Sequence, residues 1–139
     1  MGHVFELERF VKAQDPVLEE ALLELRRGRK QGHWMWFIFP QMKGPGSSAM
    51  AQRFAISSRA EAQAYLAHAV LGPRLVECTQ AVNAVERRSA EEIFGYVDAM
   101  KFRSSMTLFR EVSSEGLFDQ ALKKYFAGEP DARTLQLLG

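Results

Sequence analysis

The chain has 139 residues, of which 47% are hydrophobic and 25% charged, a composition typical of one folded globular domain and unlike that of a disordered chain. The 18 Lys and Arg residues against 17 Asp and Glu leave a formal net charge of +1, so the overall field gives no reason to expect nucleic acid or an anionic membrane as a partner. The longest apolar run, residues 34–39, is far shorter than the ~20 residues of a membrane-spanning helix.

The segment MGHVFELERF at the N-terminus places acidic residues between its apolar positions and lacks the apolar core of a signal peptide, which predicts a cytoplasmic protein. The single cysteine, Cys78, excludes an internal disulfide. No internal repeat or low-complexity tract marks a linker, so residues 1–139 are expected to form one domain. We expect a monomer or a weak homodimer that carries no cofactor.

Two helices are expected before residue 28. The first has apolar residues at helical spacing, at Val4, Leu7, Phe10 and Val11. It should end before Asp15-Pro16, because the residue before a proline is pushed out of the α conformation. Asp15 is then expected to cap a second helix that has Pro16 at its first position, and Gly28 is expected to end that helix.

The most informative stretch is GRKQGHWMWFIFPQMKGPG, residues 28–46, which places two Trp, two Phe, Ile and Met between a basic start and a Pro/Gly-rich end. Each aromatic ring buries about 150–250 Å² when it leaves water, so this run either anchors a core or lines a pocket. Residues 34–39 are too short for periodicity to distinguish a strand from a helical turn, and we interpret them as irregular or as a short helix. Pro40 and the Gly44-Pro45-Gly46 group predict a loop over residues 40–47.

Two capping boxes mark helix starts in the second half of the chain. Ser58 with Glu61 three residues later opens one helix, and Ser89 with Glu92 opens a shorter one. Between these two helices, the apolar spacing of residues 72–85 predicts a third.

Longer apolar patterns follow toward the C-terminus. Apolar residues recur at three- and four-residue intervals at Phe102, Met106 and Phe109. Asp98 is expected to cap this helix, residues 117–126 repeat the pattern, and Asp131 is expected to cap a last turn or two. Because no strand pattern occurs, the sequence predicts an all-α fold: a compact single-domain bundle of about seven or eight helices, with an irregular aromatic segment near residues 33–46.

Four sequence blocks, in this order, resemble an uncharacterised family. They are RFVKAQDP at 9–16, GRKQGHWMWFIFPQ at 28–41, LGPRL at 71–75 and KFRSSMTLF at 101–109. The family is domain of unknown function 1810, some members of which carry the name calpastatin. The resemblance implies a compact helical domain and no established activity, cofactor or catalytic residue. The chain departs from the family pattern at four positions. Proline is common at the positions of Ala69 and Val97, a second Asp often follows Asp98 at the position of Ala99, and tyrosine is frequent at the position of Phe54.

We predict a ligand pocket between the aromatic segment and the late helix. Apolar rings and fixed cations occur together there, and ligand pockets are mostly apolar with a few placed polar groups. The residues expected to bind a small anionic or nucleotide-like molecule are His33, Trp34, Trp36 and Gln41, with Lys101, Arg103, Ser104 and Ser105 closing the pocket. If Arg53 or Arg74 converges with Lys101 and Arg103, charge-assisted hydrogen bonds would hold the anion.

Two alternative functions compete with this pocket. A hydrolase acting on a nucleotide or ADP-ribose-type bond would use His33 or Asp98 as its base and Arg103 to stabilise transition-state charge. A protein-interaction module would expose part of the aromatic segment to a partner helix or peptide. The exposure of Trp34 and Trp36 distinguishes these functions from a role in the core alone.

Structural roles are the simpler interpretation of several of these residues. His33 is expected to lie satisfied in an aromatic core, and His68 to bond the last carbonyls of a helix. The loop 43–48 has the ingredients of an anion-binding nest but is interpreted as a plain turn with a Ser cap. Cys78 is expected to be a small buried hydrophobe, and no metal site is predicted.

Overall fold

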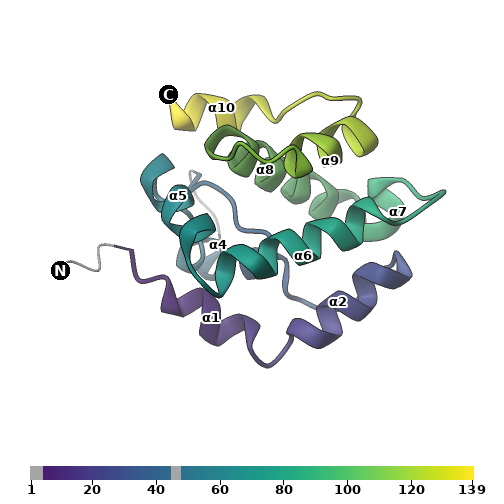
Figure 1. Ribbon diagram of the computed structural model, residues 1–139, viewed down its shortest axis with the longest axis horizontal. Coiled ribbons are helices and arrows are strands. Elements are labelled where there is room, and N and C mark those ends of the chain that lie inside the picture. The colour runs from purple at the N-terminus through teal and green to yellow at the C-terminus, as the bar shows by residue number, and fades with distance from the viewer. Residues whose placement is uncertain (1–4, 45–47) are drawn as a thin grey trace.

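Helices make up almost all the regular structure of the computed structural model, which describes residues 5–44 and 48–139 (Figure 1). These ranges contain ten helices: α1 (Glu8–Gln14), α2 (Leu18–Arg27), α3 (Met35–Ile38), α4 (Ala49–Arg53), α5 (Arg59–Ala67), α6 (Leu71–Asn83), α7 (Ala90–Phe94), α8 (Tyr96–Val112), α9 (Leu117–Phe126) and α10 (Ala132–Leu138). The prediction of an all-α chain is confirmed. The helices outnumber the expected seven or eight because the aromatic segment and residues 49–53 each form a short helix; Val4 and residues 45–47 of the expected loop lie outside the described residues.

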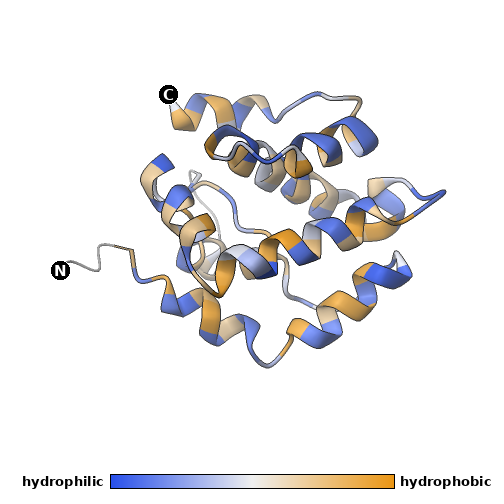
Figure 2. Ribbon diagram, in the orientation of Figure 1, coloured by the Kyte–Doolittle hydropathy of each residue, from blue (hydrophilic) through white to orange (hydrophobic). Residues whose placement is uncertain are grey.

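The longest helix, α8, forms the centre of the bundle. It packs against α5, α7, α9 and α10, while α6 packs against α2, α5 and α9. Phe102, Met106 and Phe109 of α8 are fully buried, as their spacing predicts. Figure 2 shows hydrophobic and hydrophilic residues alternating around the helices, as expected where each helix buries one face. The buried apolar side chains join into one cluster that runs from α1 to α9.

Several helix ends that local sequence signals predict are confirmed. Gly28 ends α2 in the left-handed conformation, with φ at 72°. Ser89 and Glu92 form a complete capping box at the start of α7. The Asp131 carboxylate accepts a hydrogen bond from the Thr134 backbone N–H at 2.9 Å and so caps α10.

Two predicted caps are wrong. Asp15 has helical backbone angles, whereas an N-cap needs an extended conformation, and its carboxylate bonds Arg74 at 2.8 Å instead. Asp98 lies inside the first turn of α8 rather than before it. The reason is Gly95, which at φ 82° ends α7 and allows α8 to begin at the next residue.

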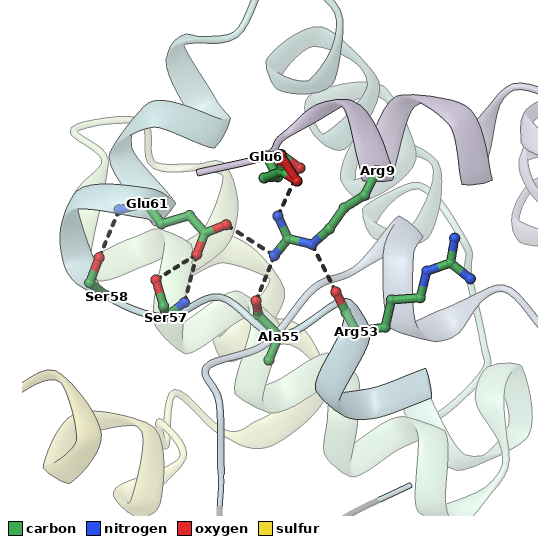
Figure 3. Close-up of polar contacts among 7 residues, drawn as sticks. All are labelled: Glu6, Arg9, Arg53, Ala55, Ser57, Ser58 and Glu61. Atoms are coloured by element: carbon green, nitrogen blue, oxygen red, sulfur yellow. Dashed lines mark hydrogen bonds and ion pairs between the residues drawn. The ribbon is translucent and has the colours of Figure 1, made fainter. Parts of the chain in front are cut away.

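The capping box predicted at Ser58 is only half formed. Ser58 accepts a hydrogen bond from the Glu61 backbone N–H, but the Glu61 carboxylate accepts from both the N–H and the hydroxyl of Ser57 and pairs with Arg9 at 3.0 Å (Figure 3). Arg9 also donates to three backbone carbonyl oxygens, those of Glu6, Arg53 and Ala55. This Arg9–Glu61 cluster therefore holds α1 against the chain between α4 and α5.

The corner between α5 and α6 is tight, and it changes the role of His68. The Nδ1 atom of His68 accepts hydrogen bonds from the backbone N–H groups of Val70 and Leu71, at 3.1 and 3.2 Å. His68 therefore bonds the start of α6 and not the last carbonyls of α5, which corrects the prediction. Gly72 allows the close approach, because a Cβ atom there would lie 2.1 Å from the carbonyl oxygen of Leu66.

Candidate functional site

A cavity of about 350 Å³ lies where the aromatic segment meets α4, α8 and α10. Its walls come from α3 and the following loop (Trp36, Gln41, Met42, Gly44), from α4 and the residues after it (Ala51, Phe54, Ala55), from α8 (Lys101, Ser104) and from α10 and its cap (Asp131, Arg133, Thr134, Leu137). Of the eight residues expected at the site, Trp36, Gln41, Lys101 and Ser104 lie on this lining. His33, Trp34, Arg103 and Ser105 do not.

Trp36 presents a half-buried ring to the cavity, and the Lys101 ammonium lies over it, 4.8 Å from the ring centroid. Lys101 is also 3.5 Å from the Asp98 carboxylate. That carboxylate has a closer partner, because Lys30, whose side chain is 8% exposed, approaches it to 2.8 Å. Lys101 is therefore the more weakly held of the two lysines, and its charge is only partly compensated.

Another part of the lining is the first turn of α10 and its cap. Here the Asp131 carboxylate accepts from both the N–H and the hydroxyl of Thr134, at 2.9 and 2.6 Å, so it is committed to capping the helix. The side chain of Arg133 is exposed and forms no ion pair or hydrogen bond with any residue that the structure describes. The lining thus carries two cations, Lys101 and Arg133, against one carboxylate, Asp131, and is net positive.

Trp34 belongs to the core and His33 to the surface. Trp34 is 2% exposed, and its indole N–H donates to Glu24 at 3.0 Å. His33 is exposed, which corrects both the expectation of a core histidine and its place in a pocket. The two residues are neighbours in a bend, and turning the larger apolar ring inward leaves the imidazole in water.

The buried Glu24 carboxylate holds the turn that leads into the aromatic segment. One of its oxygens accepts from the N–H groups of Gln31 and Gly32, both at 2.8 Å, as well as from the Trp34 indole. Burial alone would raise the pKa of Glu24, but the hydrogen bonds from Gly32, Gln31 and Trp34 and the charge of Lys30 together hold that pKa below its usual value. The ionised carboxylate therefore fixes the point at which the chain enters the core.

Arg103 and Ser105 point away from the cavity, although they flank residues that line it. The Arg103 guanidinium donates to the backbone carbonyl of Glu129 at 2.9 Å and lies 5.6 Å from the Phe126 ring centroid. Ser105 is fully buried. Residues two positions apart on a helix do not share a face, so Lys101 and Arg103 cannot both serve one cavity.

Gln14, a residue that sequence reasoning missed, fixes the position of α3. It is 1% exposed and donates to the Phe37 carbonyl at 2.8 Å and to the Tyr65 hydroxyl at 2.9 Å. Arg74 donates to the Gln14 side-chain oxygen at 3.3 Å, so the Arg74 guanidinium is used here and does not converge with Lys101. A glutamine at the end of α1 carries no sequence signal of burial, which is why its role emerges only from the fold.

Replacing Ser105 by alanine should keep the free energy of unfolding unchanged or raise it by up to about 1 kcal/mol. The Ser105 hydroxyl is fully buried and has no hydrogen-bond partner among the described residues, so its removal relieves a desolvated polar group. Urea denaturation measures the change. Thr107→Val is the matched control, because the Thr107 hydroxyl bonds Arg103 and Asp131 and its loss should cost about 1–3 kcal/mol. A loss of more than 1 kcal/mol in Ser105→Ala would contradict this account.

The described residues give little support to the alternative functions. Neither His33 nor Asp98 lines the cavity, so the nominated bases of a hydrolase are not brought to it. Most of the aromatic segment is buried, and only Trp36 among its rings is half-buried.

Within the described ranges, no three His, Cys, Asp or Glu side chains are arranged to hold a metal ion. Burial raises the pKa of the Cys78 thiol to about 12, and Cys78 is the small buried hydrophobe that was expected.

Comparisons with other proteins place the chain among relatives of unknown function. The crystal structure of the conserved hypothetical protein Rv1873 from Mycobacterium tuberculosis is 56% identical, with 96% of each chain covered and a TM-score of 0.94. No curated protein matches the chain. Among the described residues, no helix has both the length and the apolar character needed to cross a membrane. A family model described as protein of unknown function (DUF1810) matches residues 4–138, and the chain belongs to this family.

Proposed function

We propose that the cavity between α3, α4, α8 and α10 binds a small anionic molecule that carries a planar ring, as a nucleotide does. The strongest support is that one cavity is lined by a half-buried ring, Trp36, and by two incompletely paired cations, Lys101 and Arg133. The lining has one carboxylate, Asp131, which caps α10 through two hydrogen bonds from Thr134 and is outnumbered by these two cations.

The dimensions and chemistry of the cavity suit such a ligand. Its volume of about 350 Å³ falls within the ~300–1,000 Å³ of small-molecule sites. Trp36 supplies a stacking surface, and Met42 and Leu137 supply apolar walls. Lys101 would exchange its long contact with Asp98 for a charge-assisted hydrogen bond to the ligand, and the exposed Arg133 would supply a second, bidentate one.

Substituting the two cations should weaken binding of the monophosphates AMP, GMP and UMP, which serve as probes. We expect Arg133→Gln and Lys101→Gln each to raise the Kd by about tenfold, because each removes a charge-assisted hydrogen bond. Isothermal titration calorimetry measures the affinity. Arg103→Gln is the matched control, since Arg103 lies two residues from Lys101 on α8 but bonds Glu129 and should leave the Kd unchanged.

Tryptophan fluorescence provides an independent readout of the same site. Trp34 is buried and Trp36 lines the cavity, so a bound base should change the emission of Trp36 only. In Trp36→Phe, titration should leave the remaining emission constant. The proposal is wrong if none of the probes binds, or if Arg103→Gln weakens binding as much as Arg133→Gln does.

A further inference from the structure

A second cavity, also of about 350 Å³ but shallower and more open to solvent, adjoins the first. Ala55 lines both cavities, and the chain contributes neighbouring residues to each, Met42 and Phe54 to the first and Lys43 and Arg53 to the second. Residues 41–43 run beside Ile56, to which Met42 forms an isolated parallel bridge, and Ala55 comes directly before Ile56 in the chain. Hydrogen bonds of 2.8 Å from the Lys43 N–H to the Ile56 carbonyl and from the Ile56 N–H to the Gln41 carbonyl fix this shared wall.

The second cavity has two cations without a charged partner. The side chains of Lys43 and Arg53 are exposed, and neither forms an ion pair with any described residue. Figure 3 shows the Arg53 guanidinium extending away from the Arg9–Glu61 cluster. Arg9 and Glu61 also line the second cavity, but they form an ion pair and their charges neutralise each other. Glu6 is the one remaining carboxylate on this lining, so the second cavity is also net positive.

A side-chain contact between Arg53, of the second cavity, and Phe54, of the first, also connects the two linings. The Arg53 guanidinium lies 5.1 Å from the ring centroid of Phe54, a residue of the first cavity's lining. The four cations Lys101, Arg133, Lys43 and Arg53 thus line two neighbouring cavities that share Ala55. Lys101 and Arg133 line the first cavity, and Lys43 and Arg53 line the second.

We infer that Lys43 and Arg53 form a second anion subsite, and that the ligand is a nucleoside polyphosphate whose phosphate chain passes Ala55 from the first cavity into the second. This inference rests on the proposed function, since Trp36 is taken to hold the base. Each added phosphate brings more negative charge and further acceptor oxygens, which arginine and lysine side chains recognise by charge-assisted hydrogen bonds.

The test compares mono-, di- and triphosphates of the same nucleoside by isothermal titration calorimetry in magnesium-free buffer. We expect ATP to bind the intact protein at least about tenfold more tightly than AMP, with ADP between them. The double variant Lys43→Gln/Arg53→Gln should bind AMP as the intact protein does and lose the gain for ATP. Glu6→Gln should strengthen ATP binding, because it removes the opposing carboxylate. The series is repeated with GMP, GDP and GTP.

A matched control removes two exposed cations elsewhere. Arg27→Gln/Arg29→Gln lowers the net charge by the same amount at the end of α2, where neither residue lines either cavity, and should leave every affinity unchanged. Equal affinity for AMP and ATP would overturn the second subsite and leave the proposed function standing. A gain for ATP that survives in the Lys43→Gln/Arg53→Gln variant would also overturn it. If no nucleotide of either series binds, both the subsite and the proposed function are wrong.

Discussion

Replacing Arg9 by alanine is expected to lower the free energy of unfolding by about 3 kcal/mol, the low end for breaking a buried ion pair. The Glu61 side chain is only 3% exposed, so the substitution leaves its charge buried without a cation. It also removes the donor to the carbonyls of Arg53 and Ala55. The low end applies because Arg9, at 21% exposure, keeps some contact with water. Urea denaturation measures the loss.

The control for Arg9 is Arg26→Ala, because Arg26 pairs with Glu77 at 3.2 Å while both side chains are more than half exposed. That pair should contribute less than about 1 kcal/mol. Combining Arg9→Ala with Glu61→Gln should recover part of the stability, since the buried charge is then gone. Equal losses in Arg9→Ala and Arg26→Ala would contradict a structural role for the buried pair.

The Arg9–Glu61 cluster also connects stability to the proposed ligand site. Arg9 binds the carbonyls of Arg53, which lines the second cavity, and of Ala55, which lines both. The backbone of one of the proposed ligand-binding cations, Arg53, is thus held by a second cation, Arg9, whose own charge pairs with Glu61. The side chain of Arg53 is therefore exposed while its backbone is held in place by Arg9.

Features that depend on neighbouring residues could be predicted from the sequence. The left-handed Gly28, the capping box of Ser89 and Glu92 and the Asp131 cap each involve atoms a few residues apart, and all three occur as expected. Asp15 had the same kind of local signal and was wrong, because its carboxylate pairs with Arg74, 59 residues away. A local capping signal does not determine the structure when the side chain has a charged partner elsewhere in the fold.

The site was only partly predictable for a similar reason. Aromatic rings and cations near a predicted core suggest a pocket, and four of the residues named on that ground, Trp36, Gln41, Lys101 and Ser104, line the cavity. Helical geometry alone could have separated Lys101 from Arg103, which lie two residues apart on one helix. Arg133 could not be found in this way. It is an exposed arginine in a short terminal helix, and only the packing of α10 against α8 brings it to the cavity.

Replacing Gly72 by alanine is expected to lower the free energy of unfolding by about 3 kcal/mol or more, at or beyond the usual range for overpacking. The added Cβ would lie 2.1 Å from the Leu66 carbonyl oxygen and 3.1 Å from its carbonyl carbon. Both are backbone atoms at the end of α5, so no side-chain rotation relieves the clash. The α5–α6 corner has to open, which would also disturb the hydrogen bonds from Val70 and Leu71 to His68. Thermal and urea denaturation measure the loss.

Gly116→Ala is the matched control, because no atom lies within 4 Å of the position of its Cβ and its φ of −73° suits alanine. This substitution should leave the stability unchanged or raise it by about 0.4–1 kcal/mol, since alanine restricts the unfolded chain. The contrast between the two glycines separates a steric cause from a general effect of losing glycine. If Gly72→Ala proves as well tolerated as Gly116→Ala, then α5 and α6 do not meet at the distance described, and the close corner that orients His68 is wrong.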